Sequence, residues 1–377
     1  MFYIGEGKKL TLDGVTLVGL PDNDRPLVEV GEGGELVMVS GTIRGNGGGS
    51  VRTDRGTFTM LGGFVEGIDP YIQWTLVPQD KMPGYFESVT YGNGRFIAVG
   101  RGVGGGVGSN MAYSMDGITW TDITDKMPNG TSFQNITFCG GKFFTYGYGA
   151  MATSTDGENW TVVVSNLRND ISAPAYGNGR YVFVTGGGLI MYSTDGITWT
   201  NAANRPSGLY QYKSVAYGNG KFIATSYHEG RRIAYSVDGV TWTAANTTVE
   251  FGNANIIFGA GKFVVSAWEG IAYSEDGFTW TYVEMVRAFR NGHSWSITYD
   301  GSKFVAVSRG GEIDGIAYSA DGVTWETFEF IAFGGTRLDE IAYGNGRFVV
   351  VGSIWDWENA RGLLPNSNKI AYSNVQE

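Results

Sequence analysis

The chain has 377 residues and a formal net charge of −10 at pH 7, and 42% of the residues are hydrophobic and 14% aromatic. This composition supplies ample apolar area for a core, and the negative charge argues against nucleic acid as a partner. No apolar run approaches the roughly 18 residues that a membrane span needs, so no membrane insertion is expected, and a single cysteine excludes an intrachain disulfide.

Residues 1–70 repeat a pattern of short strands with glycine corners. Residues 9–17 (KLTLDGVTL) resemble residues 35–43 (ELVMVSGTI) and 57–65 (TFTMLGGFV), at offsets of 26 and 22. Short strands at this period predict the rungs of a short β-solenoid, similar to a parallel β-helix. The first residues do not form a signal peptide, and we expect these rungs to be the last of a longer stalk. The alternative is a small β cap.

From residue 71 to residue 377, the phrase Ser-x-Asp-Gly-x-x-Trp recurs. Six copies are whole, at 114–120, 154–160, 193–199, 236–242, 274–280 and 319–325. A seventh is split between residues 372–374 and residues 73–75. A turn phrase such as Tyr91-Gly92-Asn93-Gly94 and a phrase close to Ala-Tyr-Ser each recur seven times as well. The mean period is about 42 residues, which is typical of propeller blades.

Each period contains four short alternating segments. In the first period these are residues 88–91, 95–99, 111–114 and 119–121. Asn93-Gly94 and Asp116-Gly117 favour tight hairpins, because such residues tolerate positive φ. The pattern therefore predicts an all-β chain with a seven-bladed β-propeller over residues 71–377. The split phrase predicts that residues 72–78 complete the last blade and close the ring, which removes open sheet edges.

The recurring phrase resembles the Asp-box, or BNR, repeat of sialidase-type propellers. The resemblance implies a structural hairpin between the third and fourth strands of each blade. In that hairpin the Asp would accept backbone N–H bonds, and the Trp would pack between neighbouring blades. Neither residue is then a catalytic candidate. The whole arrangement resembles propellers of phage tail receptor-binding proteins and bacterial surface proteins.

The strand order distributes the connections over two faces of the ring. The Asn-Gly and Asp-Gly turns lie on one face, which we call the hairpin face. The connections between the second and third strands and between blades lie on the other, the loop face. The seven repeats differ most on the loop face, and binding residues concentrate on such loops.

Tryptophans outside the repeated phrase make the loop face a candidate binding surface. Trp355 and Trp357 would point the same way from a strand and form a flat platform, and Trp295 takes a register at the rim of the central channel. Flat aromatic rings beside carboxylates suit sugars, although the same rings could instead cap loops against the propeller body. The predicted ligand-binding residues are Trp268, Glu269, Trp295, Trp355, Asp356, Trp357, Glu358, His228, Arg231 and His293.

Other site chemistries find less support in the sequence. His228 and His293 come from different blades without a nearby third ligand, so no metal and no cofactor are predicted. Arg231 could bind an acidic sugar or remain a solvated charge. Sialidase activity is disfavoured, because the Arg-Ile-Pro phrase of that family is missing and sialidases have six blades. Another glycoside hydrolase would need two carboxyl groups roughly 5–10 Å apart, which sequence spacing does not reveal, and no catalytic residue is assigned.

We therefore expect a non-catalytic recognition or adhesion module that binds a cell-surface glycan or a surface protein. The location would be a virion tail or the cell exterior, and the N-terminal stalk could form a homotrimer. Two alternatives stay open: a glycoside hydrolase that acts on a polysaccharide, and a structural scaffold that docks another protein.

Overall fold

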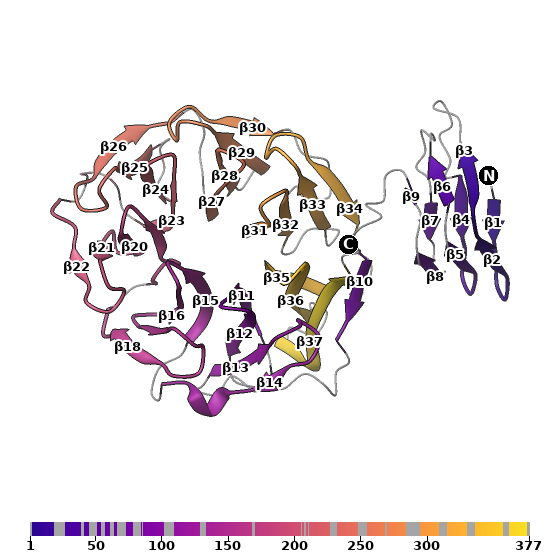
Figure 1. The fold of residues 1–377 in the computed structure, drawn as a ribbon, viewed down its shortest axis with the longest axis horizontal. Coiled ribbons are helices and arrows are strands. Elements are labelled where there is room, and N and C mark those ends of the chain that lie inside the picture. Colours follow the sequence, from indigo (N-terminus) through magenta and orange to yellow (C-terminus); the bar gives the residue numbers. More distant parts are fainter. Residues whose placement is uncertain are drawn as a thin grey trace. The chain divides into compact units, whose positions relative to one another are not determined.

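The computed structural model describes residues 2–18, 27–38, 41–44, 51–53, 57–60, 64–65, 73–77, 84, 86–101, 109–128, 133–167, 170–204, 206, 209, 211–226, 232–247, 255–267, 270–283, 295–308, 315–329, 336–356 and 362–374. The chain divides into two compact units, Met1–Thr75 with Ser373–Glu377 and Leu76–Tyr372. Within these residues, no helix is long and apolar enough to cross a membrane. Figure 1 shows the order of the elements.

The N-terminal unit contains three parallel sheets of three strands each. They are β1 (Phe2–Ile4), β4 (Val28–Val30) and β7 (Val51–Thr53); β2 (Lys9–Leu12), β5 (Glu35–Met38) and β8 (Thr57–Met60); and β3 (Val15–Val18), β6 (Gly41–Arg44) and β9 (Phe64–Val65). Lys9 pairs with Glu35 and Glu35 with Thr57, which matches the sequence offsets. The buried side chains of Ile4, Leu36 and Ile43, one from each sheet, belong to one cluster. The solenoid remains a prediction.

The chain from Gln73 onwards forms a seven-bladed β-propeller, as the repeat count predicts (Figure 1). Every blade is a four-stranded antiparallel sheet whose first strand is innermost. Blades 1 to 3 are β11 (Ser88–Gly92), β12 (Arg95–Arg101), β13 (Ser109–Ser114) and β14 (Thr121–Asp122); β15 (Phe133–Cys139), β16 (Lys142–Gly147), β17 (Met151–Ser154) and β18 (Thr161–Val164); and β19 (Ala175–Gly177), β20 (Arg180–Val184), β21 (Ile190–Ser193) and β22 (Thr200–Asn201). A short 3-10 helix, η3 (Thr124–Lys126), follows blade 1.

The remaining blades repeat the same order. Blades 4 to 6 are β23 (Tyr212–Gly218), β24 (Lys221–Ser226), β25 (Arg232–Ser236) and β26 (Thr243–Asn246); β27 (Asn255–Gly259), β28 (Lys262–Ala267), β29 (Gly270–Ser274) and β30 (Thr281–Val283); and β31 (Trp295–Tyr299), β32 (Phe304–Ser308), β33 (Gly315–Ser319) and β34 (Glu326–Glu329). Blade 7 consists of β35 (Thr336–Gly344), β36 (Arg347–Asp356), β37 (Gly362–Asn374) and β10 (Gln73–Leu76).

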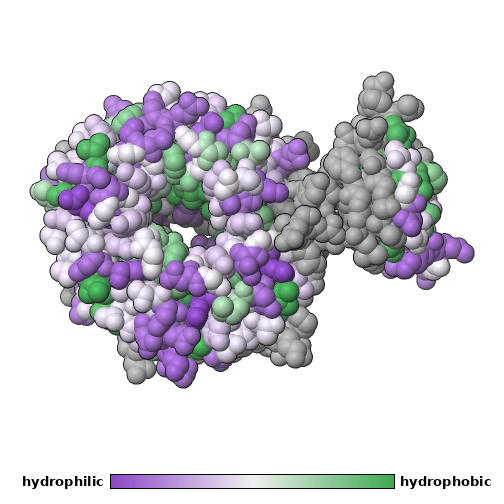
Figure 2. All heavy atoms as spheres, in the orientation of Figure 1, coloured by the Kyte–Doolittle hydropathy of each residue, from purple (hydrophilic) through white to green (hydrophobic). Residues whose placement is uncertain are grey.

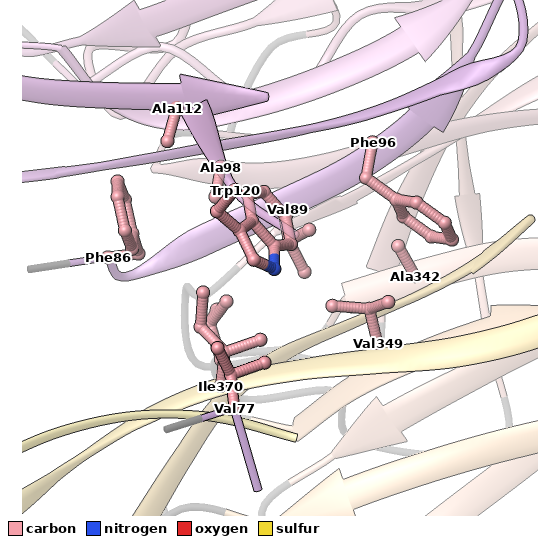
Figure 3. Close-up of a cluster of buried hydrophobic side chains, with 11 residues drawn as sticks. Val77, Phe86, Val89, Phe96, Ala98, Ala112, Trp120, Ala342, Val349 and Ile370 are labelled. Atoms are coloured by element: carbon pink, nitrogen blue, oxygen red, sulfur yellow. The ribbon is translucent and has the colours of Figure 1, made fainter. Parts of the chain in front are cut away.

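Blade 7 therefore takes its outer strand from the start of the propeller sequence. Just past β10, the N–H of Val77 donates to the carbonyl of Ile370 at 2.8 Å. Both side chains are buried in a cluster that also holds Phe86, Val89 and Trp120 of blade 1 (Figure 3). Hydrogen bonds and apolar burial, without a covalent link, thus join the two ends of the ring.

Neighbouring blades meet where an aromatic ring lies on a glycine. Phe258, at the end of an inner strand, packs on Gly218 of the preceding blade so closely that a Cβ there would lie 2.1 Å from the ring. The same contact closes the ring, where a Cβ on Gly344 would lie 1.9 Å from Tyr91. Each such aromatic residue also packs against the next strand of its own blade, as Tyr91 does against Phe96, with ring centroids 4.7 Å apart and the rings tilted by 57°. The glycine is required here for close approach, because only hydrogen fits.

The Ser-x-Asp-Gly-x-x-Trp phrase folds as a tight turn between the third and fourth strands. In blade 5, Asp276 Oδ1 accepts the N–H groups of Phe278 and Thr279, both at 2.7 Å. The Ser274 hydroxyl donates to the same oxygen at 2.9 Å and accepts the N–H of Gly277 at 2.8 Å. The carboxylate satisfies backbone donors that the turn would otherwise leave open. The same bonds are made by Asp116, Asp156, Asp195, Asp238 and Asp321.

The Trp of the phrase packs between two blades. Trp280 Nε1–H donates to the carbonyl of Gly277 at 3.0 Å, which fixes the ring beneath its own turn. The buried ring shares a core cluster with Ala216 and Ile223 of blade 4 and with Phe263 of blade 5. The Asp and Trp of the phrase therefore hold the propeller together, as the resemblance implied.

We predict that Gly344→Ala and Gly218→Ala each lower the free energy of unfolding by roughly 3 kcal/mol or more, because the added methyl group overlaps an aromatic ring on the next blade. Gly186→Ala is the matched control, since a Cβ there meets nothing within 4 Å. Urea unfolding followed by tryptophan fluorescence measures the effect. Equal losses in all three variants would contradict the aromatic-on-glycine contact.

A second prediction concerns acid. Burial raises the pKa of Asp276, but the N–H bonds from Phe278 and Thr279 outweigh it and lower the pKa to about 2. Because the unfolded pKa is about 3.9, stability should be lost as pH falls from about 4 towards 2. We expect Asp276→Ala to cost roughly 1–2 kcal/mol at pH 7 and to lose less than the wild type on acidification. Asp125→Asn, at an exposed carboxylate, should change neither the stability at pH 7 nor its loss on acidification. If Asp276→Ala lost stability on acidification as the wild type does, the role of Asp276 in the turn would be contradicted.

Candidate functional site

The hairpin face is fixed by hydrogen bonds between blades. An asparagine in the inner turn of one blade donates through Nδ2 to a carbonyl in the outer turn of the next. The pairs are Asn93 with Thr155, Asn178 with Val237, Asn219 with Glu275, and Asn345 with Met115, at 2.8, 3.2, 2.9 and 3.3 Å. Each of these asparagines has a positive φ, as its tight turn requires. The last pair joins blade 7 to blade 1.

The basic side chains of these turns also serve the ring. Arg95 Nη1 lies 2.8 Å from Glu158 Oε1 of the next blade. Lys221 Nζ donates to the Asp276 carbonyl at 3.0 Å, and the Arg347 guanidinium lies 5.4 Å from the centre of the Tyr372 ring. Arg95 and Arg347 belong to the turns between the first and second strands, so they lie on the hairpin face, and these contacts engage them in packing.

Most of the predicted binding residues lie outside the part of the chain that the structure describes. These are His228, Arg231, Trp268, Glu269, His293, Trp357 and Glu358. For Trp295, Trp355 and Asp356 the structure gives the backbone only. Trp295 begins β31, the inner strand of blade 6, and pairs with Ser308.

Trp355 and Asp356 end the strand β36 and pair with Leu363 and Gly362 of β37. At 10 and 13 residues, β36 and β37 are longer than any other second and third strands of the described blades. Their shared end points to the loop face, because it holds the connection between the second and third strands. Blade 7 therefore carries an extended hairpin, and the backbone brings Trp355 and Asp356 to its end.

The loop-face end of the central channel carries polar residues on β-bulges. The pairing of the inner strands skips one residue in blades 2, 4 and 7, which leaves Gln134, Lys213 and Asp339 as the extra residues. Bulges redirect side chains and are frequent beside binding sites. Lys213 is exposed, and Glu87 takes the same place just ahead of β11. Figure 2 shows the opening at the centre of the ring.

One residue further along the inner strands, polar side chains link several pairs of successive blades; we call Ser88, Ser214, Ser296 and Glu340 the collar. Ser88 Oγ accepts the N–H of Ile136 in the next blade at 2.9 Å. Ser214 and Ser296 accept the N–H groups of Ile256 and Ile341 in the same way, both at 3.3 Å. The residue of blade 7 at this position is Glu340. The sequence-based prediction does not include the collar. Comparing the residues that lie three positions before the aromatic residue of each turn phrase would have revealed its polar members.

Glu340 is the titratable member of the collar. Burial, and to a smaller extent the charge of Asp339, raise the pKa of the half-buried Glu340 carboxyl to about 8, against the opposing hydrogen bonds from the Ser88 hydroxyl and the Val89 N–H. Burial and the nearby Glu340 also raise the pKa of Tyr146 well above its usual value. At neutral pH the carboxyl of Glu340 is therefore mostly protonated.

Metal and thiol chemistry find no support in the described residues. Among them, no group of three or more His, Cys, Asp or Glu side chains is placed to hold a metal ion. Burial raises the pKa of the Cys139 thiol to about 12, which leaves it protonated and unreactive.

Comparison with known proteins shows a common fold. No family model matches the chain, and no curated protein matches it. The structure of YCF48 from Cyanidioschyzon merolae matches with a TM-score of 0.54 and 18% sequence identity, over 80% of this chain and 98% of that one. A structure of YCF48 bound to D1 peptide matches with a TM-score of 0.55 and 18% identity, over 81% and 95% of the two chains. At this identity the likeness shows the β-propeller fold alone.

Proposed function

We propose that this protein is a non-catalytic recognition module that binds a cell-surface glycan through its loop face. The observation that carries the proposal is the extended β36–β37 hairpin of blade 7, which departs from the repeat and bears Trp355 and Asp356 at its end. An indole and a carboxylate carried by one loop suit a sugar, because an aromatic ring can meet its apolar face and a carboxylate can accept hydrogen bonds from its hydroxyl groups. The hairpin face, by contrast, is committed to bonds between blades.

The bulged residues at the channel mouth support a polar ligand on the same face. Gln134, Lys213 and Asp339 sit at the loop-face ends of three inner strands, where each blade could instead have kept regular pairing. Bulges persist where a redirected side chain is useful. Amide, ammonium and carboxylate groups at one rim offer donors and acceptors to hydroxyl-rich ligands.

A surface protein is the second candidate partner. The similar structure of YCF48 is bound to a D1 peptide, so a propeller of this architecture can dock a polypeptide. On that reading the loop face would receive a segment of another protein, and the chain would act as a scaffold.

The wider setting follows from the sequence. We propose that the recurring turn is an Asp-box and that the three parallel sheets are rungs of a β-helix, since their side chains share one buried cluster. Such rungs would form a stalk that presents the propeller from a virion tail or a cell surface, with a homotrimer as the candidate assembly. A glycoside hydrolase remains the enzymatic alternative, and the raised pKa of Glu340 beside Asp339 is the observation in its favour.

We predict that Trp355→Ala weakens glycan binding at least tenfold, because stacking on the indole is lost. The experiment is a glycan array with the full chain, followed by calorimetric titration of the glycans that bind. Tyr282→Ala is the matched control, since it removes an exposed aromatic ring from the outer strand β30. We expect the control to bind like the wild type.

Three outcomes would overturn glycan recognition by this face. The first is equal binding by the wild type and Trp355→Ala. The second is an array without hits together with capture of a defined surface protein, which would favour the scaffold. The third is release of reducing sugar from bound glycans that Asp356→Asn or Glu340→Gln abolishes, which would establish a hydrolase.

A further inference from the structure

We propose that Glu340 is a proton-controlled latch that holds blade 7 to blades 1 and 2. The position matters because β35, β36 and β37 reach blade 1 only through non-covalent contacts: β37 is the last strand in the sequence, and β10 is the first of the ring. Elsewhere the described collar bonds use serine, as Ser214 and Ser296 do. A titratable group occupies this place at the one blade that is assembled from both ends.

The latch is a chain of hydrogen bonds across three blades. The N–H of Ile136 in blade 2 donates to Ser88 Oγ in blade 1 at 2.9 Å. The Ser88 hydroxyl also lies 3.4 Å from the Ile136 carbonyl, and it forms a hydrogen bond with the Glu340 carboxyl in blade 7. The N–H of Val89 bonds to the same carboxyl. A change at Glu340 therefore acts on two neighbouring blades together.

The surroundings of the carboxyl favour its neutral form. Asp339 precedes it on β35, Glu87 precedes Ser88 on β11, and Tyr146 lies on β16 of blade 2 and feels its charge. None of these three groups is cationic. An ionised Glu340 would thus add negative charge beside Asp339 in a half-buried site, which weakens the junction.

The direction of the pH effect follows from linkage. The carboxyl has a pKa of about 8 in the folded protein and about 4.3 in the unfolded chain. Between these values the folded protein binds more protons than the unfolded chain, so stability falls as pH rises through this window and levels off above pH 8. The junction of blade 7 with blades 1 and 2 is most stable when the Glu340 carboxyl is protonated, and it loses stability when the carboxyl ionises.

The test compares unfolding of the full chain at pH values from about 5 to 9 for the wild type and Glu340→Gln. Gln keeps the shape and an acceptor but cannot ionise. We expect the unfolding equilibrium constant of the wild type, relative to that of Glu340→Gln, to rise by up to about tenfold per pH unit in this window. Parallel pH profiles for the two proteins would overturn the latch. Glu326→Gln, at an exposed residue of the outer strand β34, serves as control and should follow the wild type.

Two further measurements keep the test decisive if Glu340→Gln folds poorly. Ser88→Ala removes a bond that lowers the pKa of Glu340, so the pH at which stability levels off should move upward. An unchanged pH profile would contradict the role of the Ser88 hydrogen bond. Hydrogen–deuterium exchange supplies a local readout. Relative to the Ile256 peptide at the Ser214 junction, the Val89 peptide of the wild type should lose protection as pH rises from about 5 to 8. Equal changes at both peptides would show that the effect is global and would reject the latch.

Discussion

The aromatic ring that lies on a glycine sets the distance and angle between neighbouring blades. Phe258 on Gly218 and Tyr91 on Gly344 are the same contact at different points of the ring, and a side chain of any size at the glycine would force the sheets apart. The contact recurs at Gly92, Gly177 and Gly259, where a Cβ would lie 2.1, 2.0 and 2.5 Å from the aromatic ring of the next blade. The same contact joins blade 7 to blade 1.

The exceptions show how tightly the contact is defined. In blade 2 the glycine position holds Cys139, and the next residue, Gly140, receives Tyr176 instead: a Cβ on Gly140 would lie 2.6 Å from that ring. The carbonyl of Gly140 also accepts the hydroxyl of Tyr181 at 2.5 Å. The contact is thus kept by a shift of one residue, and a tyrosine hydroxyl supplies the link between blades that asparagine provides elsewhere. At the junction of blades 6 and 7 the glycine position holds Asp300, and a Cβ on Gly301 would meet nothing within 4 Å, so this junction forms without the contact.

The sequence predicts the parts of the fold that recur and misses those that occur once. Repeated Trp, Asn-Gly and Asp-Gly signals specify the blades, because each has one low-energy local structure. The bulges at Gln134, Lys213 and Asp339 leave no such signal, since a skipped pairing looks like ordinary alternation. Glu340 was missed for a related reason: a polar residue on an inner strand resembles a solvent-facing one until the neighbouring blade is in place. The loop-face residues such as Trp268 and His228 follow no repeat, and pattern therefore cannot place them.

The composite blade has a consequence for the order in which the molecule is made. β10 leaves the ribosome before any other propeller strand, and its partner β37 leaves last, so roughly three hundred residues must be synthesised before the pair can form. Throughout that interval β10 presents unpaired backbone groups, and such edges invite wrong partners. Contacts between residues so distant in sequence also form slowly. Ring completion must therefore wait for β37, and a chain truncated before β37 would keep most of its blades but never seal.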